Sequence, residues 1–415
     1  MVIRRVIAVL AAPFGLVIGV ATLLVVVAVT ANRPLAIASG AVVLTAAAAA
    51  LGWWGLRGVR ARVGLTIGAA GAALVLLTVL LGAVVYAPAA PTTPYPAVST
   101  IQYIDLPTGS RIAYTKTSAT GEPHAAPVIL VHGGPGAPDQ PVPEPAAALA
   151  GAGFDVYAYH QAGSGQSGRL ADPTHYTVAR HLADLDAFRA ALGADRVILV
   201  GASWGGQLIA NYLALHAARV EKAVVVSPGP IWSPTYDDAE RLTAAGRRDQ
   251  EDVVAQRPRF LLAHLLMNVV GPRGAQALLP DSTMDGEFEA IVNQIDMRPG
   301  CRTDPIPRDR PPAVGLGFWA NAATSLDSQR VADPRPLLRE VPTPVLVLRG
   351  ECDYLAWPVA REYRDLLPNA TLMAVDGAGH ALAADQPELF QQATLAYLRD
   401  EPLPRPPYQG HDPPW

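Results

Sequence analysis

Hydrophobic residues are concentrated at the start of the chain, where three long apolar runs follow one another: Val6–Ala31, Pro34–Leu56 and Val63–Tyr86. A helix needs about 20 apolar residues to cross the hydrocarbon core of a bilayer, and each run is long enough. Only short polar stretches separate the runs, as hairpins between membrane helices require. The pattern therefore predicts a membrane region over residues 1–86 with three transmembrane helices.

The arginines at the ends of these runs predict an orientation, because cytoplasmic loops carry an excess of Lys and Arg. Arg33 alone lies between the first two runs. The other arginines precede the first run or lie between the second and third: Arg4, Arg5, Arg57, Arg60 and Arg62. We therefore expect a multi-pass protein of the cell membrane, with everything after Tyr86 outside the cytoplasm. A cleaved signal peptide in place of the first helix is disfavoured, since two further runs follow it.

Beyond residue 98 the pattern changes to short β-rich apolar runs that alternate with amphipathic helical segments. This alternation favours an α/β domain with a mostly parallel sheet. The predicted divisions are a proline-rich linker (87–98), the two parts of the α/β core (99–229 and 336–400), a helical cap between them (230–335) and a proline-rich tail (401–415).

The individual elements of the core can also be placed. The predicted strands are 101–106 and 111–115, which form an opening hairpin, then 128–131, 155–159, 197–200, 223–226 and 345–348, and a last one that ends near Val375. The predicted helices are 178–192, 203–215, 359–367 and 387–398.

Composition limits the function classes. The 415 residues are 50% hydrophobic and 16% charged, with a net charge of −4, which fits a membrane part joined to a soluble part. The sequence has no basic cluster with interleaved aromatic residues, so it gives no indication of a nucleic-acid partner. No Cys or His cluster has the spacing of metal ligands, and we expect no metal or other cofactor. The two cysteines, Cys301 and Cys352, either form a disulfide in an oxidising compartment or remain free thiols.

The strongest chemical signal is the pentapeptide Gly201-Ala202-Ser203-Trp204-Gly205, which follows a predicted strand and opens a predicted helix. In this G-x-S-x-G context the serine lies on a sharp turn that exposes its hydroxyl, and the glycines avoid collisions at the turn. The turn also presents the serine at a helix N-terminus, where backbone donors favour negative charge. Ser203 is therefore the predicted nucleophile.

A serine nucleophile needs a base, and the base needs an acid to orient it. Asp353 follows the predicted strand 345–348, at the sheet edge where such folds build their sites, and is the predicted acid. Glu351 in the same loop is the alternative. His380 follows the last strand in a glycine-rich loop and is the predicted base. The chain order Ser, Asp, His matches the order found with this type of turn.

The predicted strand 128–131 runs into the glycine-rich turn His132-Gly133-Gly134-Pro135-Gly136. Such a turn leaves backbone N–H groups free to stabilise a developing oxyanion. We expect the oxyanion hole to consist of the amides of Gly134 and Trp204, with Gly133 as a further possibility; a plain tight turn is the alternative.

These motifs together resemble the proline iminopeptidase (prolyl aminopeptidase) branch of the α/β-hydrolases. The resemblance rests on residues 132–136 and 201–206, with Gly350–Asp353 and Gly379-His380 at the acid and base positions. It implies an α/β-hydrolase fold and a serine peptidase that removes an N-terminal residue from a small peptide, with cap carboxylates holding the free amine. The acidic residues available in the cap are Asp237, Asp238, Glu240, Asp285, Glu287 and Glu289.

Two features depart from this family pattern. The membrane region is an addition, with the bilayer as its expected partner. The family loop Asp-Gln-Arg-Gly is replaced by His160-Gln161-Ala162-Gly163, so a specificity other than strict proline is open. An esterase or lipase remains the nearest alternative, since the same triad cleaves esters, and a membrane-tethered binding module without turnover is a third. Dehalogenase and epoxide hydrolase chemistry is disfavoured, because those enzymes carry an aspartate at the position of Ser203.

Overall fold

The computed structural model describes residues 2–138, 145–298 and 312–415. The chain divides into two compact units. One consists of Met1–Ala90 together with Pro258–Glu287, and the other of Pro91–Arg257 together with Phe288–Trp415. The first unit therefore combines the apolar N-terminal region with a segment from the middle of the predicted cap.

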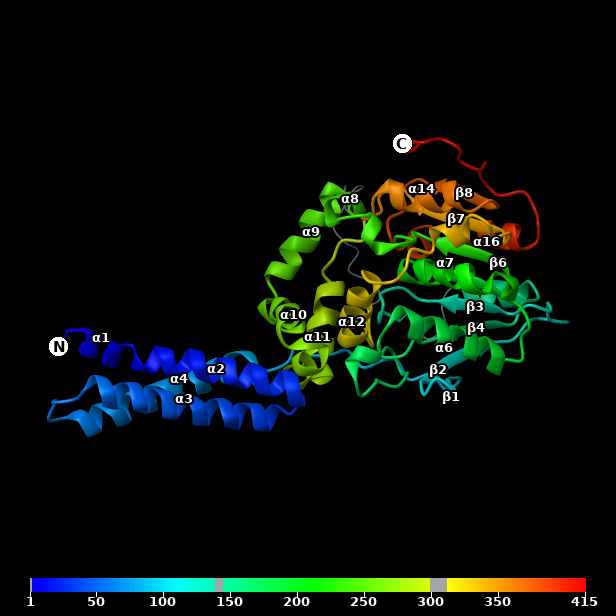
Figure 1. Cartoon of the computed structure of the whole chain (residues 1–415). Coiled ribbons are helices and arrows are strands. Elements are labelled where there is room, and N and C mark those ends of the chain that lie inside the picture. Colours follow the sequence, from blue (N-terminus) through cyan, green and yellow to red (C-terminus); the bar gives the residue numbers. More distant parts are fainter. Residues whose placement is uncertain (1, 139–144, 299–311) are drawn as a thin grey trace. The chain divides into compact units, whose positions relative to one another are not determined.

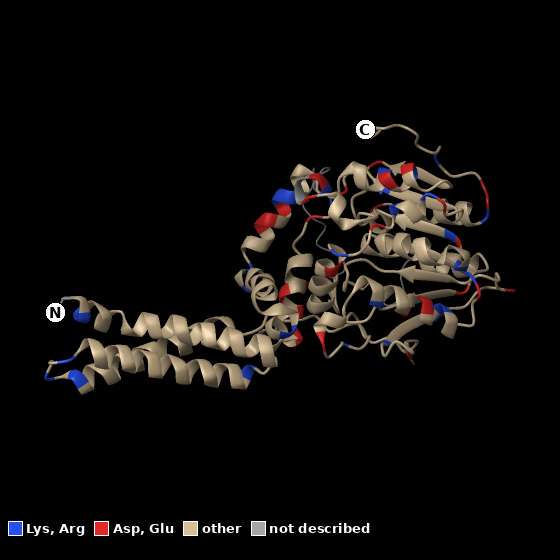
Figure 2. Ribbon diagram, in the orientation of Figure 1, with Lys and Arg blue, Asp and Glu red and all other residues tan. Residues whose placement is uncertain are grey.

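The N-terminal part of the first unit is helical throughout. Its helices are α1 (Val2–Val9), α2 (Ala11–Thr30), α3 (Arg33–Gly55) and α4 (Arg62–Val84). Helices α2, α3 and α4 are long and apolar enough to cross a membrane, as the sequence predicted. Figure 2 shows Lys and Arg only near the ends of these helices.

Small residues allow α2 and α3 to approach each other closely. A Cβ atom added to Gly19 would lie 2.8 Å from the carbonyl oxygen of Gly40, and one added to Gly40 would lie 2.8 Å from that of Gly19. Arginines contact aromatic rings at both ends of the helices. The Cζ atom of Arg62 lies 3.4 Å from the ring centroid of Trp53, and that of Arg33 lies 5.4 Å from the ring centroid of Tyr86.

The second unit is built on one eight-stranded sheet with the order β1-β2-β4-β3-β5-β6-β7-β8. Strand β2 pairs antiparallel with β1 and β4, and all other neighbours are parallel. The strands are β1 (Gln102–Asp105), β2 (Arg111–Thr117), β3 (Val128–Val131), β4 (Val156–Tyr159), β5 (Val197–Ala202), β6 (Val220–Val226), β7 (Val345–Gly350) and β8 (Ala370–Val375). The predicted opening hairpin and mostly parallel sheet are both present.

Helices flank this sheet in Figure 1. They are α5 (Pro145–Gly151), α6 (Val178–Ala191), α7 (Trp204–His216), α14 (Trp357–Leu366), α15 (Leu382–Asp385) and α16 (Pro387–Leu398). Between β6 and β7 lie α8 (Asp238–Arg241), α9 (Ala244–Ala255), α10 (Pro258–Leu278), α11 (Asp281–Val292), α12 (Phe318–Ser328) and α13 (Arg335–Leu338). Helix α5 is not among the sequence-based predictions.

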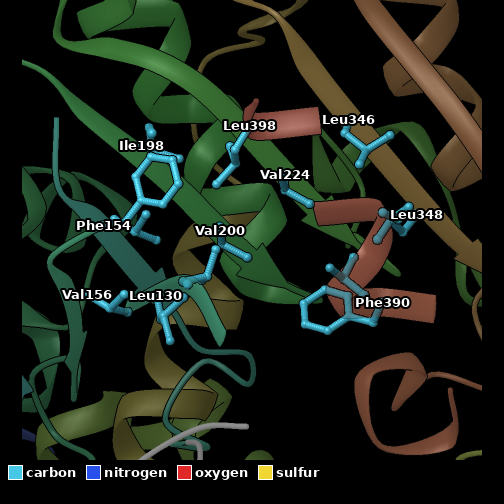
Figure 3. Packing of buried hydrophobic residues seen from close by; sticks show 14 of the residues in the cluster. Leu130, Phe154, Val156, Ile198, Val200, Val224, Leu346, Leu348, Phe390 and Leu398 are labelled. Atoms are coloured by element: carbon cyan, nitrogen blue, oxygen red, sulfur yellow. The ribbon is translucent and has the colours of Figure 1, made fainter. Parts of the chain in front are cut away.

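A buried apolar cluster joins one face of the sheet to α5 and α16 (Figure 3). It contains Leu130, Val200 and Leu348 from the parallel strands and Phe390 from α16. Strands buried in this way read as continuous apolar runs, which is why the sequence located them. The cluster fixes the strands whose carboxyl ends carry the predicted site residues.

The start of one predicted strand and the kink of one cap helix each have a physical cause in the structure. Strand β6 begins three residues before the predicted Ala223, because Lys222 is stabilised inside the domain. Its ammonium group donates to the carbonyl oxygens of Tyr397 and Leu398, each at 3.0 Å, and pairs with Asp400. Helix α10 is kinked, since Gly271 has φ 75° and ψ 164° and Pro272 follows it.

Cys352 is buried and disulfide-bonded. Cys301, the only other cysteine of the chain, lies outside the described residues. The sequence left open a disulfide or two free thiols, and the bonded state of Cys352 agrees with the disulfide.

Candidate active site

Ser203 lies on the turn between β5 and α7, with the unusual backbone angles φ 54° and ψ −120°. A non-glycine residue in this region is strained by about 1–3 kcal/mol and persists only where its surroundings impose it. The surroundings here are crowded: a Cβ atom at Gly201 would lie 2.6 Å from Cδ1 of Ile209, and one at Gly205 would collide with the carbonyl oxygen of Val131. Both glycines of the motif are therefore required for this turn.

Asp353 and His380 are in direct contact. Nδ1 of His380 lies 2.8 Å from Oδ1 of Asp353, which is the contact that orients a histidine base. Glu351 takes a different position, where its carboxylate accepts a hydrogen bond from the Gly377 amide at 2.9 Å. The ring of Tyr354 lies against that of His380, with 4.1 Å between the centroids. The structure thus pairs His380 with Asp353 and separates it from the alternative acid.

The charge of Asp353 is stabilised although its side chain is buried. Burial alone raises the pKa of a carboxyl group, but the charges of His380 and Arg349 and hydrogen bonds from His380 and the Leu355 amide outweigh it, so the pKa of Asp353 lies below its ordinary value. Arg349 is buried as well, with Nη1 3.6 Å from Oδ2 of Asp353. Asp353 is therefore held as an anion beside the histidine.

All three predicted triad residues follow carboxyl ends of parallel strands: Ser203 follows β5, Asp353 follows β7 and His380 follows β8. Within the described residues, no hydrogen bond joins Ser203 to His380. Nucleophile–base hydrogen bonds are often long before substrate binds, so the common sheet edge and the orientation of His380 are the relevant observations.

The predicted oxyanion donors are the backbone amides of Gly134 and Trp204. No described residue accepts a hydrogen bond from the amide of Gly134 or from that of Trp204. Gly133 lies directly against the nucleophile, since a Cβ atom there would be 3.2 Å from Cβ of Ser203. Gly134 has φ 114°, which a glycine accepts readily.

A buried hydrogen-bond network that the sequence did not predict connects the turn after β3 to the start of α7. Gln161 Nε2 donates to the carbonyl oxygen of His132 at 2.8 Å, and Gln161 Oε1 accepts from Trp204 Nε1 at 2.9 Å. The backbone N–H of Gln161 also donates to Nε2 of His132. Nδ1 of the same ring lies 2.9 Å from the carbonyl oxygen of Gly133. Burial lowers the pKa of His132 to about 4, so this ring is neutral and can accept.

His160, which stands where the family loop carries an aspartate, is also buried and neutral. Burial, with a smaller contribution from His132, lowers its pKa to about 3. Its Nε2 is 2.8 Å from the hydroxyl of Tyr95. The residue therefore brings no charge to this loop.

The cap carboxylates that the structure describes are partly occupied by other contacts. Glu287 lies 3.2 Å from Nη1 of Arg259, and Glu289 accepts a hydrogen bond from the Thr93 amide at 2.7 Å. Asp237 is bonded to the Glu240 amide. Among the described residues, no group of three or more His, Cys, Asp or Glu side chains could hold a metal ion.

Comparison with known proteins identifies the family of the chain. A family model described as alpha/beta hydrolase fold matches residues 126–387. A proline iminopeptidase of Heyndrickxia coagulans is 33% identical over 312 residues, which cover 69% of this chain and 94% of that protein. Epoxide hydrolase A of Mycobacterium tuberculosis is 27% identical over 312 residues, which cover 67% and 92% of the two chains. The crystal structure of a bromoperoxidase from Bacillus anthracis matches with a TM-score of 0.50 and 20% identity, covering 72% of this chain and all of that one (100%), and supports the fold alone.

Proposed function

Because the chain belongs to the α/β-hydrolase family, we propose that it is a membrane-anchored serine hydrolase of the aminopeptidase type, which releases an N-terminal residue from small peptides. The observation that carries this proposal is the contact between Asp353 and His380 on the sheet edge where Ser203 occupies its strained turn. A binding module needs neither feature.

In the proposed reaction, Ser203 Oγ attacks the carbonyl carbon of the substrate while Nε2 of His380 accepts its proton. Asp353 keeps the imidazole oriented through Nδ1 and stabilises the imidazolium that forms. The amides of Gly134 and Trp204 donate to the oxyanion. His380 then protonates the leaving amine, and a water molecule, activated by the same histidine, releases the acyl group from Ser203.

The aminopeptidase assignment is supported by similarity to proline iminopeptidases over most of their length. Similarity to an epoxide hydrolase supports the family, but Ser203 occupies the position where epoxide hydrolases use an aspartate. The neutral His160 favours one alternative, a carboxylic ester hydrolase. The loop carries neither charge of the family's Asp–Arg pair, and the same triad can cleave esters.

The test is hydrolysis by the full chain in detergent, because part of the cap belongs to the same unit as the N-terminal helices. Substrates are prolyl and alanyl arylamides with free or blocked N-termini, together with a simple aryl ester. Ser203→Ala is the matched control. We expect cleavage of arylamides with a free amine and its loss in Ser203→Ala by about 10³-fold or more.

Each other outcome selects one alternative. Turnover of the ester alone assigns the protein to the ester hydrolases. Equal turnover of free and blocked arylamides argues against recognition of an N-terminal amine. If no substrate is cleaved in a Ser203-dependent way, the binding-module interpretation replaces the enzyme.

A further inference from the structure

Helix α10 contains an apolar segment that neither the predicted helical cap nor the proposed chemistry explains. Residues 260–272 include no Asp, Glu, Lys or Arg, and the flanking charges are Arg259 and Arg273. Helix geometry holds from Pro258 up to Val270, before the kink at Gly271. The polar side chains of this segment bond to its own backbone: Nδ1 of His264 lies 2.9 Å from the carbonyl oxygen of Phe260, and Nδ2 of Asn268 donates to the carbonyl oxygen of His264 at 2.9 Å. A helix with so few polar side chains is normally covered by protein or lipid on most of its surface.

Only one side of this helix is buried in protein. Ala263, Leu266, Met267 and Val270 are buried. On the other side, Leu261, Leu265 and Val269 are 49%, 59% and 58% exposed. The spacing of four residues places these three side chains in one stripe along the helix. Val25 of α2 and Val75 of α4, at 63% and 62%, are exposed to the same degree.

Contacts within the first unit place α10 at one end of the N-terminal helices. Helix α10 packs against α2, where a Cβ atom at Gly274 would lie 3.3 Å from Cα of Ala28, two residues before α2 ends. Arg259 donates to the carbonyl oxygen of Pro88, four residues after α4 ends, at 3.2 Å. Both contacts belong to the end of the bundle from which the linker leaves.

We propose that the Leu261–Leu265–Val269 stripe of α10 lies in the bilayer, within the leaflet on the side of the linker, with lipid acyl chains as its partner. The proposal rests on the membrane anchoring proposed above. An interfacial helix buries its apolar face about 5–10 Å into the boundary between headgroups and acyl chains. Arg259 at the start of the segment is paired with Glu287 at 3.2 Å, so no uncompensated charge lies beside the apolar stripe.

The experiment uses the full chain in phosphatidylcholine nanodiscs, one copy per disc. An environment-sensitive fluorophore is attached to Leu265→Cys or Leu261→Cys. Quenching is measured with a phosphatidylcholine that carries a nitroxide near its acyl carbonyl, and with aqueous iodide. Val75→Cys in α4 is the membrane control, and Glu251→Cys on the exposed face of α9 is the aqueous control. The unsubstituted chain gives the background, since Cys352 is already disulfide-bonded.

We expect the lipid nitroxide to reduce the fluorescence at Leu265→Cys and Leu261→Cys about twofold, with little effect of iodide, and the reverse at Glu251→Cys. Quenching at Leu265→Cys by iodide alone would place the stripe in water and overturn the inference. Protection from both quenchers would indicate a protein partner and would also overturn it. If Val75→Cys is not quenched by the lipid, the membrane anchoring itself fails, whereas failure at α10 alone leaves it intact.

Discussion

Asp353 is the residue at which the proposed chemistry and the stability of the core are most directly coupled. Replacing it with Asn removes the anion that orients His380 and leaves the Arg349 guanidinium buried without its counter-charge. We expect Asp353→Asn to lower kcat by about 10⁴-fold, as expected when the base loses its orienting acid. Glu351→Gln in the same loop is the control and should retain most of the activity. Equal losses in both variants would contradict the assignment of the acid.

The lowered pKa of Asp353 also predicts a pH dependence of stability. A group whose pKa is depressed in the folded state contributes stability above its unfolded pKa, here near 3.8, and loses it as pH falls through the folded pKa. The free energy of unfolding of the native chain should therefore exceed that of Asp353→Asn by about 3 kcal/mol near neutral pH. The difference should shrink below about pH 4, as measured by denaturant titrations at several pH values. A difference independent of pH would exclude the buried anion.

The sequence identified Ser203, Asp353 and His380 as candidates because each follows a strand within a short, recognisable motif. It could not identify Gln161 in the same way. Gln161 bonds to His132 and Trp204, which lie 29 and 43 positions away from it along the chain. Only the pairing of β3 with β4 and β5 brings these residues together. A side chain whose role depends on such pairing leaves no local signal.

Gln161 lies in the loop after β4 and connects this loop to the turn after β3 and to the start of α7. We expect Gln161→Ala to lower kcat by about 10–100-fold while KM changes little, because the substrate would still bind but the oxyanion donors would lose their alignment. Gln166→Ala is a matched control in the same loop, since among the described residues its side chain bonds only to Tyr103, from which it accepts at the surface. A loss confined to KM would assign Gln161 to substrate binding instead.

Packing of α2 against α3 yields a second prediction at this scale. Gly19→Val would force a side chain into α3, where even a Cβ atom lies 2.8 Å from the carbonyl oxygen of Gly40. We expect a loss of about 1–3 kcal/mol in the stability of the full chain in detergent, measured by unfolding in sodium dodecyl sulfate. Gly71→Val in α4 is the control, because no atom lies within 4 Å of its added Cβ. Similar losses in both variants would argue against close packing at Gly19.

Elements were predictable where burial produced a clear pattern. The buried strands β3, β5 and β7 read as continuous apolar runs, and the three membrane candidates exceed the length of ordinary core elements. Prediction was weaker where tertiary contacts override the pattern. Lys222 interrupts the apolar run at the start of β6, and α5 has only seven residues, too few to show a helical repeat. The apolar segment of α10 lies within the predicted helical cap and was not distinguished from it.

For the whole molecule, the family assignment confirms the predicted α/β-hydrolase fold, whereas orientation in the membrane stays a prediction. The five arginines at the ends of the N-terminal helices and the single Arg33 favour a cytoplasmic N-terminus. The disulfide-bonded Cys352 adds an independent argument, since disulfides persist mainly in oxidising compartments outside the cytoplasm. Two physically unrelated features thus indicate the same side for the hydrolase domain.

This agreement can be tested with reporters fused after Tyr86. A phosphatase that is active only outside the cytoplasm should be active there, and a fluorescent protein that matures only in the cytoplasm should stay dark. Replacing Arg57, Arg60 and Arg62 with Gln should reduce phosphatase activity, because the charge bias that holds their loop in the cytoplasm is then lost. A fluorescent fusion in the native chain would place the hydrolase domain inside the cell. The disulfide would then have to form in a reducing compartment, where it would not persist.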